Sequence, residues 1–149
     1  MFGDPGHLYV YFTYGMHFCM NAVTGHAGEG SAVLLRAAEP LEGLEAMRSR
    51  RGRDGVRELC AGPARLCQAF NVDRAMDGSD LVTGSNLWIG EGTPVGLART
   101  VTGPRIGIRV GVERPWRFTV KDDPFVSGRT RGRSASGPTR SATTGPSTR

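Results

Sequence analysis

A run of aromatic and β-branched residues near the start of the chain constrains its fold most strongly. The run covers residues 8–13, is interrupted at Tyr14-Gly15 and resumes over residues 18–23. Such side chains favour strands, and a glycine between two such runs is typical of a turn. The pattern predicts a β-hairpin whose tip is Tyr14-Gly15-Met16-His17. A tyrosine at a hairpin tip is exposed, whereas core aromatics lie inside strands.

The rest of the chain predicts a few more strands and two helices. Pro40 suits the first turn of a helix, and Leu41, Leu44 and Met47 recur at helical spacing, which predicts a helix that starts at Glu39 and ends within residues 48–53. The other expected elements are a buried strand over 31–38, a helix over 64–70, a loop over 71–84, a strand over 87–89, an alternating strand over 105–112 and its partner strand over 116–120.

Composition excludes several classes of protein. The 149 residues suit about one domain. The chain has no run of 18 apolar residues and no signal-peptide pattern, so we expect neither a membrane span nor secretion. Its three cysteines form no Cys-x-x-Cys pair, which argues against a zinc site or a disulfide framework and favours a cytoplasmic protein.

The net charge of +5 arises from the C-terminal end. Residues 127–149 hold five arginines and no acidic residue; subtracting these five from the 19 basic residues leaves 14, equal to the 14 acidic residues. This end consists of Arg, Ser, Thr, Gly, Pro and Ala and has no large apolar side chain, so we expect it to be disordered. We therefore expect one compact α+β domain over residues 1–126, with a curved, mainly antiparallel sheet and a few helices.

Arginines are concentrated between Met47 and Arg57. This segment has five arginines and a single acidic residue, Asp54. Such a cluster is suited to contacts with phosphate groups. A solvated basic loop is the alternative that the sequence leaves open.

The chain resembles the alkyladenine or 3-methyladenine DNA glycosylase family over roughly residues 1–127. The resemblance rests on ordered blocks, of which the hairpin is one. The others include Ala32-Val33-Leu34-Leu35-Arg36-Ala37, Glu39-Pro40-Leu41-Glu42-Gly43-Leu44-Glu45, Glu58-Leu59-Cys60-Ala61-Gly62-Pro63, Leu66-Cys67-Gln68-Ala69, Gly103-Pro104-Arg105-Ile106-Gly107-Ile108 and Pro115-Trp116-Arg117-Phe118.

The resemblance implies a monofunctional enzyme of base-excision repair. Such enzymes flip alkylated or deaminated purines out of duplex DNA and hydrolyse the bond between base and sugar. It further implies no cofactor or metal, a monomer, double-stranded DNA as the partner, and a cytoplasmic location that is nucleoid-associated in a bacterium. The only lysine, Lys121, lies beside two aspartates and is a poor candidate for the amine nucleophile of a lyase.

The hairpin then acquires three candidate site residues. The resemblance implies that Tyr14 intercalates into DNA and that Tyr11 stacks on the flipped base. It also implies that Asn21 lines the pocket and rejects the amino group of guanine. From the residues alone, a tyrosine folded back on the sheet and an ordinary strand-end asparagine remain possible. The candidate DNA contacts are Met16, His17, Arg48, Arg50, Arg51 and Arg65.

Arg36 interrupts an otherwise apolar strand and must find a partner or a cavity. The resemblance implies that Arg36 and the main-chain carbonyl of Ile106 hold the attacking water. A salt-bridged or snorkelling strand arginine is the alternative.

Hydrolysis also requires a general base. In the family this base is a glutamate in a segment before the hairpin, and Met1 aligns with an internal point of the pattern. We therefore expect a truncated chain with little or no excision activity, or else a longer, active protein of which Met1 is an internal residue. The sequence also leaves open a non-catalytic DNA-binding fragment or a globular fragment with no function of its own.

Overall fold

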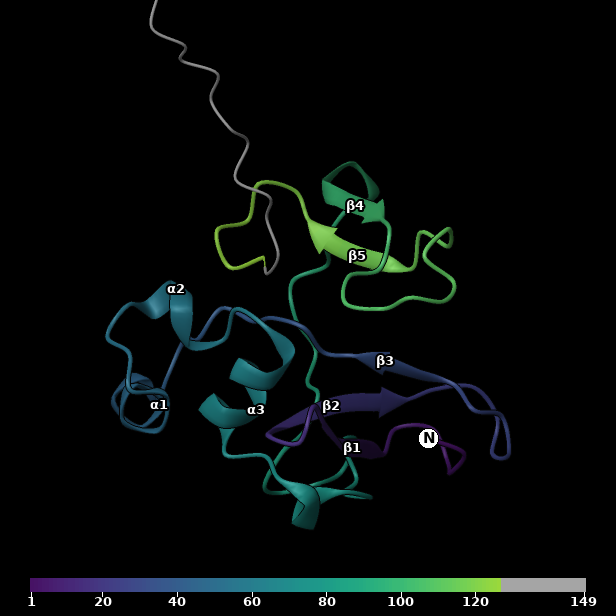
Figure 1. Cartoon of the computed structure of the whole chain (residues 1–149), viewed down its shortest axis with the longest axis horizontal. Helices are drawn as coiled ribbons and strands as arrows, with labels where there is room; N and C mark the ends of the chain where they lie inside the picture. Colours follow the sequence, from purple (N-terminus) through teal and green to yellow (C-terminus); the bar gives the residue numbers. More distant parts are fainter. Residues whose placement is uncertain (127–149) are drawn as a thin grey trace, which may run out of the picture.

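The computed structural model describes residues 1–126. The expected disorder of residues 127–149 lies outside the described residues. The described part contains two antiparallel sheets and several short helices, which confirms the α+β class (Figure 1). The elements are β1 (Leu8–Thr13), β2 (His17–Val23), β3 (Ala32–Leu34), α1 (Leu44–Arg51), α2 (Val56–Leu59), α3 (Pro63–Phe70), the 3-10 turns η1 (Arg74–Met76) and η2 (Leu97–Arg99), β4 (Thr100–Gly103) and β5 (Arg117–Val120).

The predicted hairpin is present and its register defines two faces. β1 pairs antiparallel with β2 so that Tyr9 lies opposite Asn21 and Tyr11 opposite Cys19. β3 adds to the other edge of β2, with Leu34 opposite Asn21. Because side chains alternate along a strand, these five residues share one face of the sheet. We call this face, with its residues Tyr9, Tyr11, Cys19, Asn21 and Leu34, the tyrosine face.

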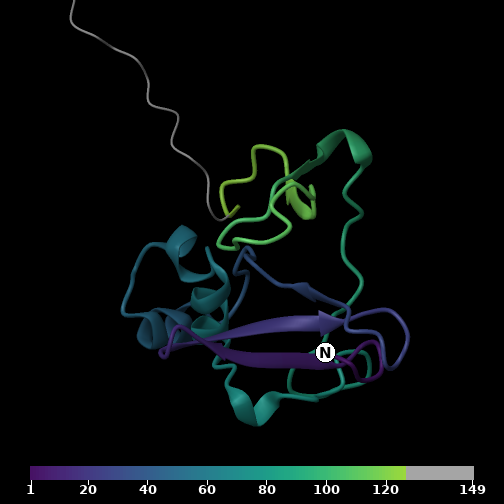
Figure 2. The same ribbon diagram turned by 45° about the vertical axis from the view of Figure 1, so that its right-hand side comes forward.

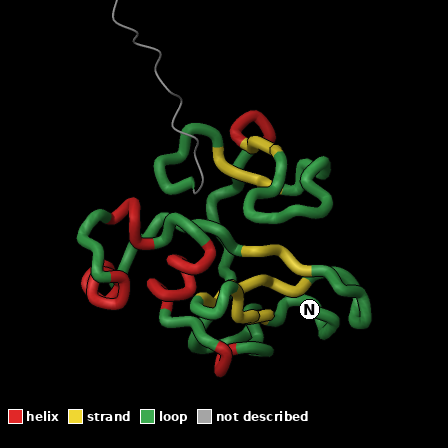
Figure 3. The backbone as a smooth tube through the Cα atoms, in the orientation of Figure 1, coloured by secondary structure: helices red, strands yellow, loops and turns green. Residues whose placement is uncertain are grey.

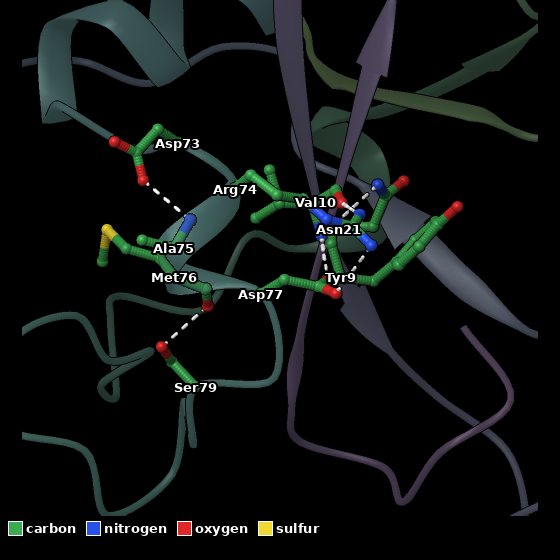
Figure 4. A network of polar contacts seen from close by, with 9 residues as sticks. All are labelled: Tyr9, Val10, Asn21, Asp73, Arg74, Ala75, Met76, Asp77 and Ser79. Carbon is green, nitrogen blue, oxygen red and sulfur yellow. Dashed lines mark hydrogen bonds and ion pairs between the residues drawn. The ribbon is translucent and has the colours of Figure 1, made fainter.

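The outer edge of β1 is covered by the chain that follows α3. The Leu8 amide donates to the Ser79 carbonyl (2.8 Å), and the Val10 amide donates to Asp77 Oδ1 (2.7 Å). The Arg74 guanidinium donates to the Val10 carbonyl and pairs with Asp77 at 3.5 Å (Figure 4). These bonds satisfy an edge that would otherwise be open to pairing with another chain.

The opposite face of the hairpin contributes to the core. Leu8, Val10 and Met20 pack there with side chains from the helices, which gather at one end of the first sheet (Figures 1 and 2). The remaining members of the buried cluster are Met47, Leu59, Cys60, Leu66, Cys67, Ala69, Val72 and Leu81. Among residues 1–126, no helix is long and apolar enough to cross a membrane.

The first predicted helix starts later than expected. α1 begins at Leu44, because Gly43 has a φ of +67°, which lies outside the right-handed helical region. α3 begins at Pro63, within a residue of the predicted start, and its C-cap Asn71 has a φ of +57°. The third strand is also shorter than the predicted 31–38 and covers only Ala32–Leu34.

The strand predicted over residues 105–112 is wrong. Gly107 and Gly111 have φ values of +79° and +71°, so the backbone turns twice where the alternating pattern requires an extended chain. The actual partner of β5 is β4, with Val101 opposite Thr119. Residues 87–89 form no strand either, and Figure 3 shows a long loop between β4 and β5.

Candidate functional site

Tyr14 lies at the tip of the hairpin, and its side chain is 78% exposed. Tyr14 and Gly15 have φ values of +53° and +66°, and the Met16 amide donates to the Thr13 carbonyl at 3.3 Å. Two successive positive φ values are typical of a type I′ turn, the form that suits the twist of a hairpin. His17, predicted at the tip, is the first residue of β2. The turn therefore presents an aromatic ring to solvent at a fixed point.

Two tyrosine rings lie together on the tyrosine face. The Tyr9 and Tyr11 rings stack with their centroids 5.6 Å apart and an interplanar angle of 25°. Both residues are partly exposed. Their stacking forms an aromatic platform on which a further planar group can lie.

Asn21 is the buried polar residue of this face and is 7% exposed. Its Nδ2 donates to the Tyr9 carbonyl at 3.1 Å, which fixes the orientation of the amide (Figure 4). The Oδ1 atom is an acceptor, so a group that approaches it must present a donor or be excluded.

Cys19 lies opposite Tyr11 and is a residue that the sequence reasoning did not select. Burial, followed by the nearby Cys19, raises the pKa of the Tyr11 phenol, and the two side chains form a hydrogen bond. Burial also raises the pKa of the Cys19 thiol, while the Tyr11 hydrogen bond and the Arg36 charge oppose this shift. The register of the hairpin could have identified this contact, because Cys19 is the residue directly opposite Tyr11 on the neighbouring strand.

Arg36 reaches from the chain after β3 to a segment 70 residues away. Its Nη1 donates to the Ile106 carbonyl at 3.4 Å, so the two predicted water-holding groups lie together. Among residues 1–126, no carboxylate forms an ion pair with Arg36. The Arg36 Nε atom is buried and makes no hydrogen bond within the described part of the chain.

The clustered arginines tie the helices together. Arg50 Nη1 donates to the Ala69 carbonyl (2.9 Å), and Arg51 Nε donates to the Leu59 carbonyl (3.1 Å). Arg48 pairs with Glu45. The Arg50 and Arg51 contacts cross-link α1 to α3 and α2.

The cluster is nevertheless a concentrated source of positive charge. Burial, followed by the charges of Arg65 and Arg53, lowers the pKa of the Arg51 guanidinium. Arg53 and Arg65 are exposed, and within residues 1–126 the side chain of each donates only to a backbone carbonyl of its own segment. The surface over α1 and α3 therefore combines structural arginines with exposed ones.

A cleft of about 480 Å³ lies beside the hairpin tip. Its lining includes Met16 and His17 from the hairpin, Arg50 from α1 and Gln68 from α3. Three of the predicted DNA contacts thus border one cleft, whereas Arg48, Arg51 and Arg65 do not line it. Among residues 1–126, no group of His, Cys, Asp or Glu is suited to hold a metal ion.

The methylpurine-DNA glycosylase family matches residues 1–124. The chain belongs to this family. It is 53% identical over 135 residues to a protein of Burkholderia lata, 48% identical over 127 residues to one of Carboxydothermus hydrogenoformans, and 52% identical over 131 residues to one of Streptomyces avermitilis. Each of the three carries the name "Putative 3-methyladenine DNA glycosylase".

The similarity covers most of this chain but a smaller part of its relatives. The matches span 86%, 85% and 85% of this chain, and 63%, 66% and 62% of the Burkholderia, Carboxydothermus and Streptomyces proteins. The chain therefore spans slightly less than two thirds of the length of these methylpurine-DNA glycosylase relatives.

Proposed function

We propose that this chain acts in base-excision repair by binding damaged purines in duplex DNA and flipping them onto the tyrosine face. Tyr14 fills the gap left in the stack, and Tyr11 stacks on the extruded base. Asn21 lines the pocket and rejects the amino group of guanine. The substrates are alkylated or deaminated purines of the 3-methyladenine type, released by hydrolysis without a lyase step.

The observation that supports this proposal is that Tyr11 and Asn21 share one face of the sheet, while Arg36, whose charge acts on Cys19 of that face, donates to the Ile106 carbonyl. An electron-poor alkylated purine gains from lying on an aromatic ring, much as a cation does. Tyr14 stands at the end of the same strand pair, as an exposed wedge requires. The arginines over α1 and α3, with Met16 and His17, supply contacts to the DNA backbone and groove.

Arg36 and the Ile106 carbonyl hold the attacking water. In this proposal the water donates to the Ile106 carbonyl and accepts a hydrogen bond from the Arg36 guanidinium. Two contacts support it: Arg36 Nη1 already reaches that carbonyl, and the Arg36 Nε–H has no partner within residues 1–126. A water molecule held in this way still needs a base to take its proton. All 14 acidic residues lie within residues 1–126, and none of them pairs with Arg36. We therefore expect residues 1–149 to bind and flip lesions well but to excise them slowly.

A non-catalytic DNA-binding module is the second candidate function. The lack of a carboxylate partner for Arg36 in the described residues favours it. The two candidates share the same recognition contacts and differ only in whether free base is released.

Fluorescence of a duplex that carries one ethenoadenine tests recognition. Replacing Tyr14 with alanine should weaken lesion binding about 10–100-fold, since stacking on a base is worth roughly 1–3 kcal/mol. Phe118→Ala is the matched control, because it removes another exposed aromatic ring, from β5. Equal binding by the Tyr14→Ala variant and the unchanged protein would overturn the wedge.

Single-turnover release of free base from the same duplex separates the two functions. No acidic side chain pairs with Arg36 within residues 1–126, so slow release is the expected result. Release that Arg36→Ala abolishes supports the hydrolase. Tight lesion binding with no detectable release supports the binding module.

A further inference from the structure

The segment that carries the Ile106 carbonyl has little burial to hold it in place. It runs between β4 and β5 without regular structure, and Ile106, Ile108, Val110 and Val112 are all exposed. A main-chain carbonyl can orient a water only if its peptide is fixed. Some contact other than hydrophobic packing must therefore fix it.

Arg105 supplies such a contact by closing the segment on itself. Its Nη2 donates to the Gly111 carbonyl at 3.1 Å and to the Val110 carbonyl at 3.3 Å. Its guanidinium also lies 5.4 Å from the centre of the Trp116 ring, and that of Arg114 lies 4.6 Å from the same ring. The side chain thus bridges both ends of the segment that starts at Ile106.

Two glycines make this closure possible. A Cβ atom on Gly111 would lie 2.5 Å from Arg105 Nη2, so any larger residue there would displace the guanidinium. Gly107 turns the chain immediately after Ile106, with a φ of +79°. The Ile106 peptide is consequently held between the anchored Arg105 and a turn.

We propose that Arg105 is a positioning residue that holds the Ile106 carbonyl against Arg36. The role of Arg105 in the reaction rests on the proposed function. Its effect on the contact between Arg36 and the Ile106 carbonyl depends on the fold alone. A planar guanidinium can bond two carbonyls and lie against Trp116 at the same time. A lysine ammonium at the same place is a point charge and cannot do both.

Four variants test the proposal. Arg105→Ala and Arg105→Lys remove the bridge, and Gly111→Ala displaces it while leaving the charge in place. Arg109→Ala is the matched control, since it removes an exposed arginine from the same segment. The first readout is the NMR signal of the Arg36 Nη1 protons, which report the hydrogen bond to the Ile106 carbonyl without requiring activity.

We expect the Arg36 signal to shift in the first three variants and to stay unchanged in Arg109→Ala. The excision rate at saturating enzyme should fall about 10–100-fold, because a displacement of the Ile106 carbonyl by about 1 Å costs up to about 10²-fold in rate. The dissociation constant for the lesion duplex should change less than about twofold. An unchanged Arg36 signal in both Arg105→Ala and Gly111→Ala would overturn the proposal.

The two proposals fail in different ways. If the unchanged protein neither binds nor excises the lesion while the Arg36 signal still shifts in Arg105→Ala, the proposed function is wrong. The effect of Arg105 on the contact between Arg36 and Ile106 is then still supported. If lesion binding falls as far as excision in Arg105→Ala, Arg105 contacts DNA or supports the fold generally, and its positioning role is rejected.

Discussion

The chain before and after Leu81 is stabilised in two different ways. Every buried residue of the described part lies at or before Leu81. From residue 82 to residue 126, the large apolar side chains are exposed or partly exposed, and Leu97 is 92% exposed. The first region is held by hydrophobic burial. The second is held by the packing of Leu87 against that core and by turns, hydrogen bonds and cation–π contacts.

This difference matters because the candidate site is divided between the two regions. The tyrosine face and Arg36 belong to the first region, whereas the Ile106 carbonyl belongs to the second. A region without a core opens at a lower free energy than one with a core. We therefore expect the tyrosine face to stay intact under conditions that already disturb the contact between Arg36 and the Ile106 carbonyl.

The largest effect is expected at Leu59, which is fully buried in the first region. Leu59→Ala should lower the free energy of unfolding by about 2–5 kcal/mol, because it removes apolar contacts and leaves a cavity. Leu97→Ala, its control in the second region, should change it by less than about 0.5 kcal/mol. Urea titration followed by circular dichroism measures both. Equal losses would contradict the assignment of the core to the first region.

A smaller and more local effect is expected at Gly84, where the second region begins. A Cβ atom there would lie 2.0 Å from the Asp80 carbonyl oxygen and 3.0 Å from that of Leu87. Gly84→Ala should therefore distort this turn at a cost of about 1–3 kcal/mol. Gly96→Ala meets open space and is the control.

The tryptophans make this change visible. Both of them, Trp88 and Trp116, lie in the second region, so their fluorescence reports on it. Gly84→Ala should alter the tryptophan emission while leaving the circular dichroism of the first region intact. Unchanged emission would show that the turn at residues 80–84 does not hold the second region.

The smallest effect is expected from protonation of Asp80. This carboxylate accepts hydrogen bonds from the Val82 and Thr83 amides (2.7 and 3.0 Å) and from the Thr83 hydroxyl. These bonds lower the pKa of Asp80 to about 2. Because the folded-state pKa is depressed, the stabilisation is present above the ordinary pKa of about 3.9 and is lost as the pH falls through about 2.

Tryptophan emission between about pH 5 and pH 1.5 measures this loss. The change should centre near pH 2 and disappear in Asp80→Asn. Glu91→Gln, which removes an exposed carboxylate from the same region, should leave the profile unchanged. An identical profile in Asp80→Asn would assign the transition to another group.

The sequence predicted the first region better than the second, and the reasons are physical. The hairpin of residues 8–23 combines strand composition with a glycine turn, so its pairing depends on neighbouring residues alone. The apolar alternation over residues 105–112 is equally regular, but Gly107 and Gly111 adopt positive φ values that alternation does not reveal. Periodicity describes side chains and not the backbone that carries them.

The candidate site was predictable only where residues share a strand pair. The roles of Tyr11 and Asn21 came from the family resemblance, and the hairpin register explains only why they share a face and why Cys19 lies opposite Tyr11. The contact between Arg36 and Ile106 joins segments 70 residues apart, and no local pattern encodes such a contact. Only the family resemblance connected these two residues before the fold was known.

The left-handed backbone of Tyr14 has a consequence for how this protein responds to selection. A positive φ is costly for a bulky residue, and asparagine followed by glycine is the preferred pair in a turn of this type. A library screened only for heat resistance should therefore replace Tyr14 by asparagine or glycine early and retain Gly15. The selected variants would be more stable and yet lose the exposed ring. Laboratory evolution toward stability would thus erase the proposed DNA wedge before it changed the core.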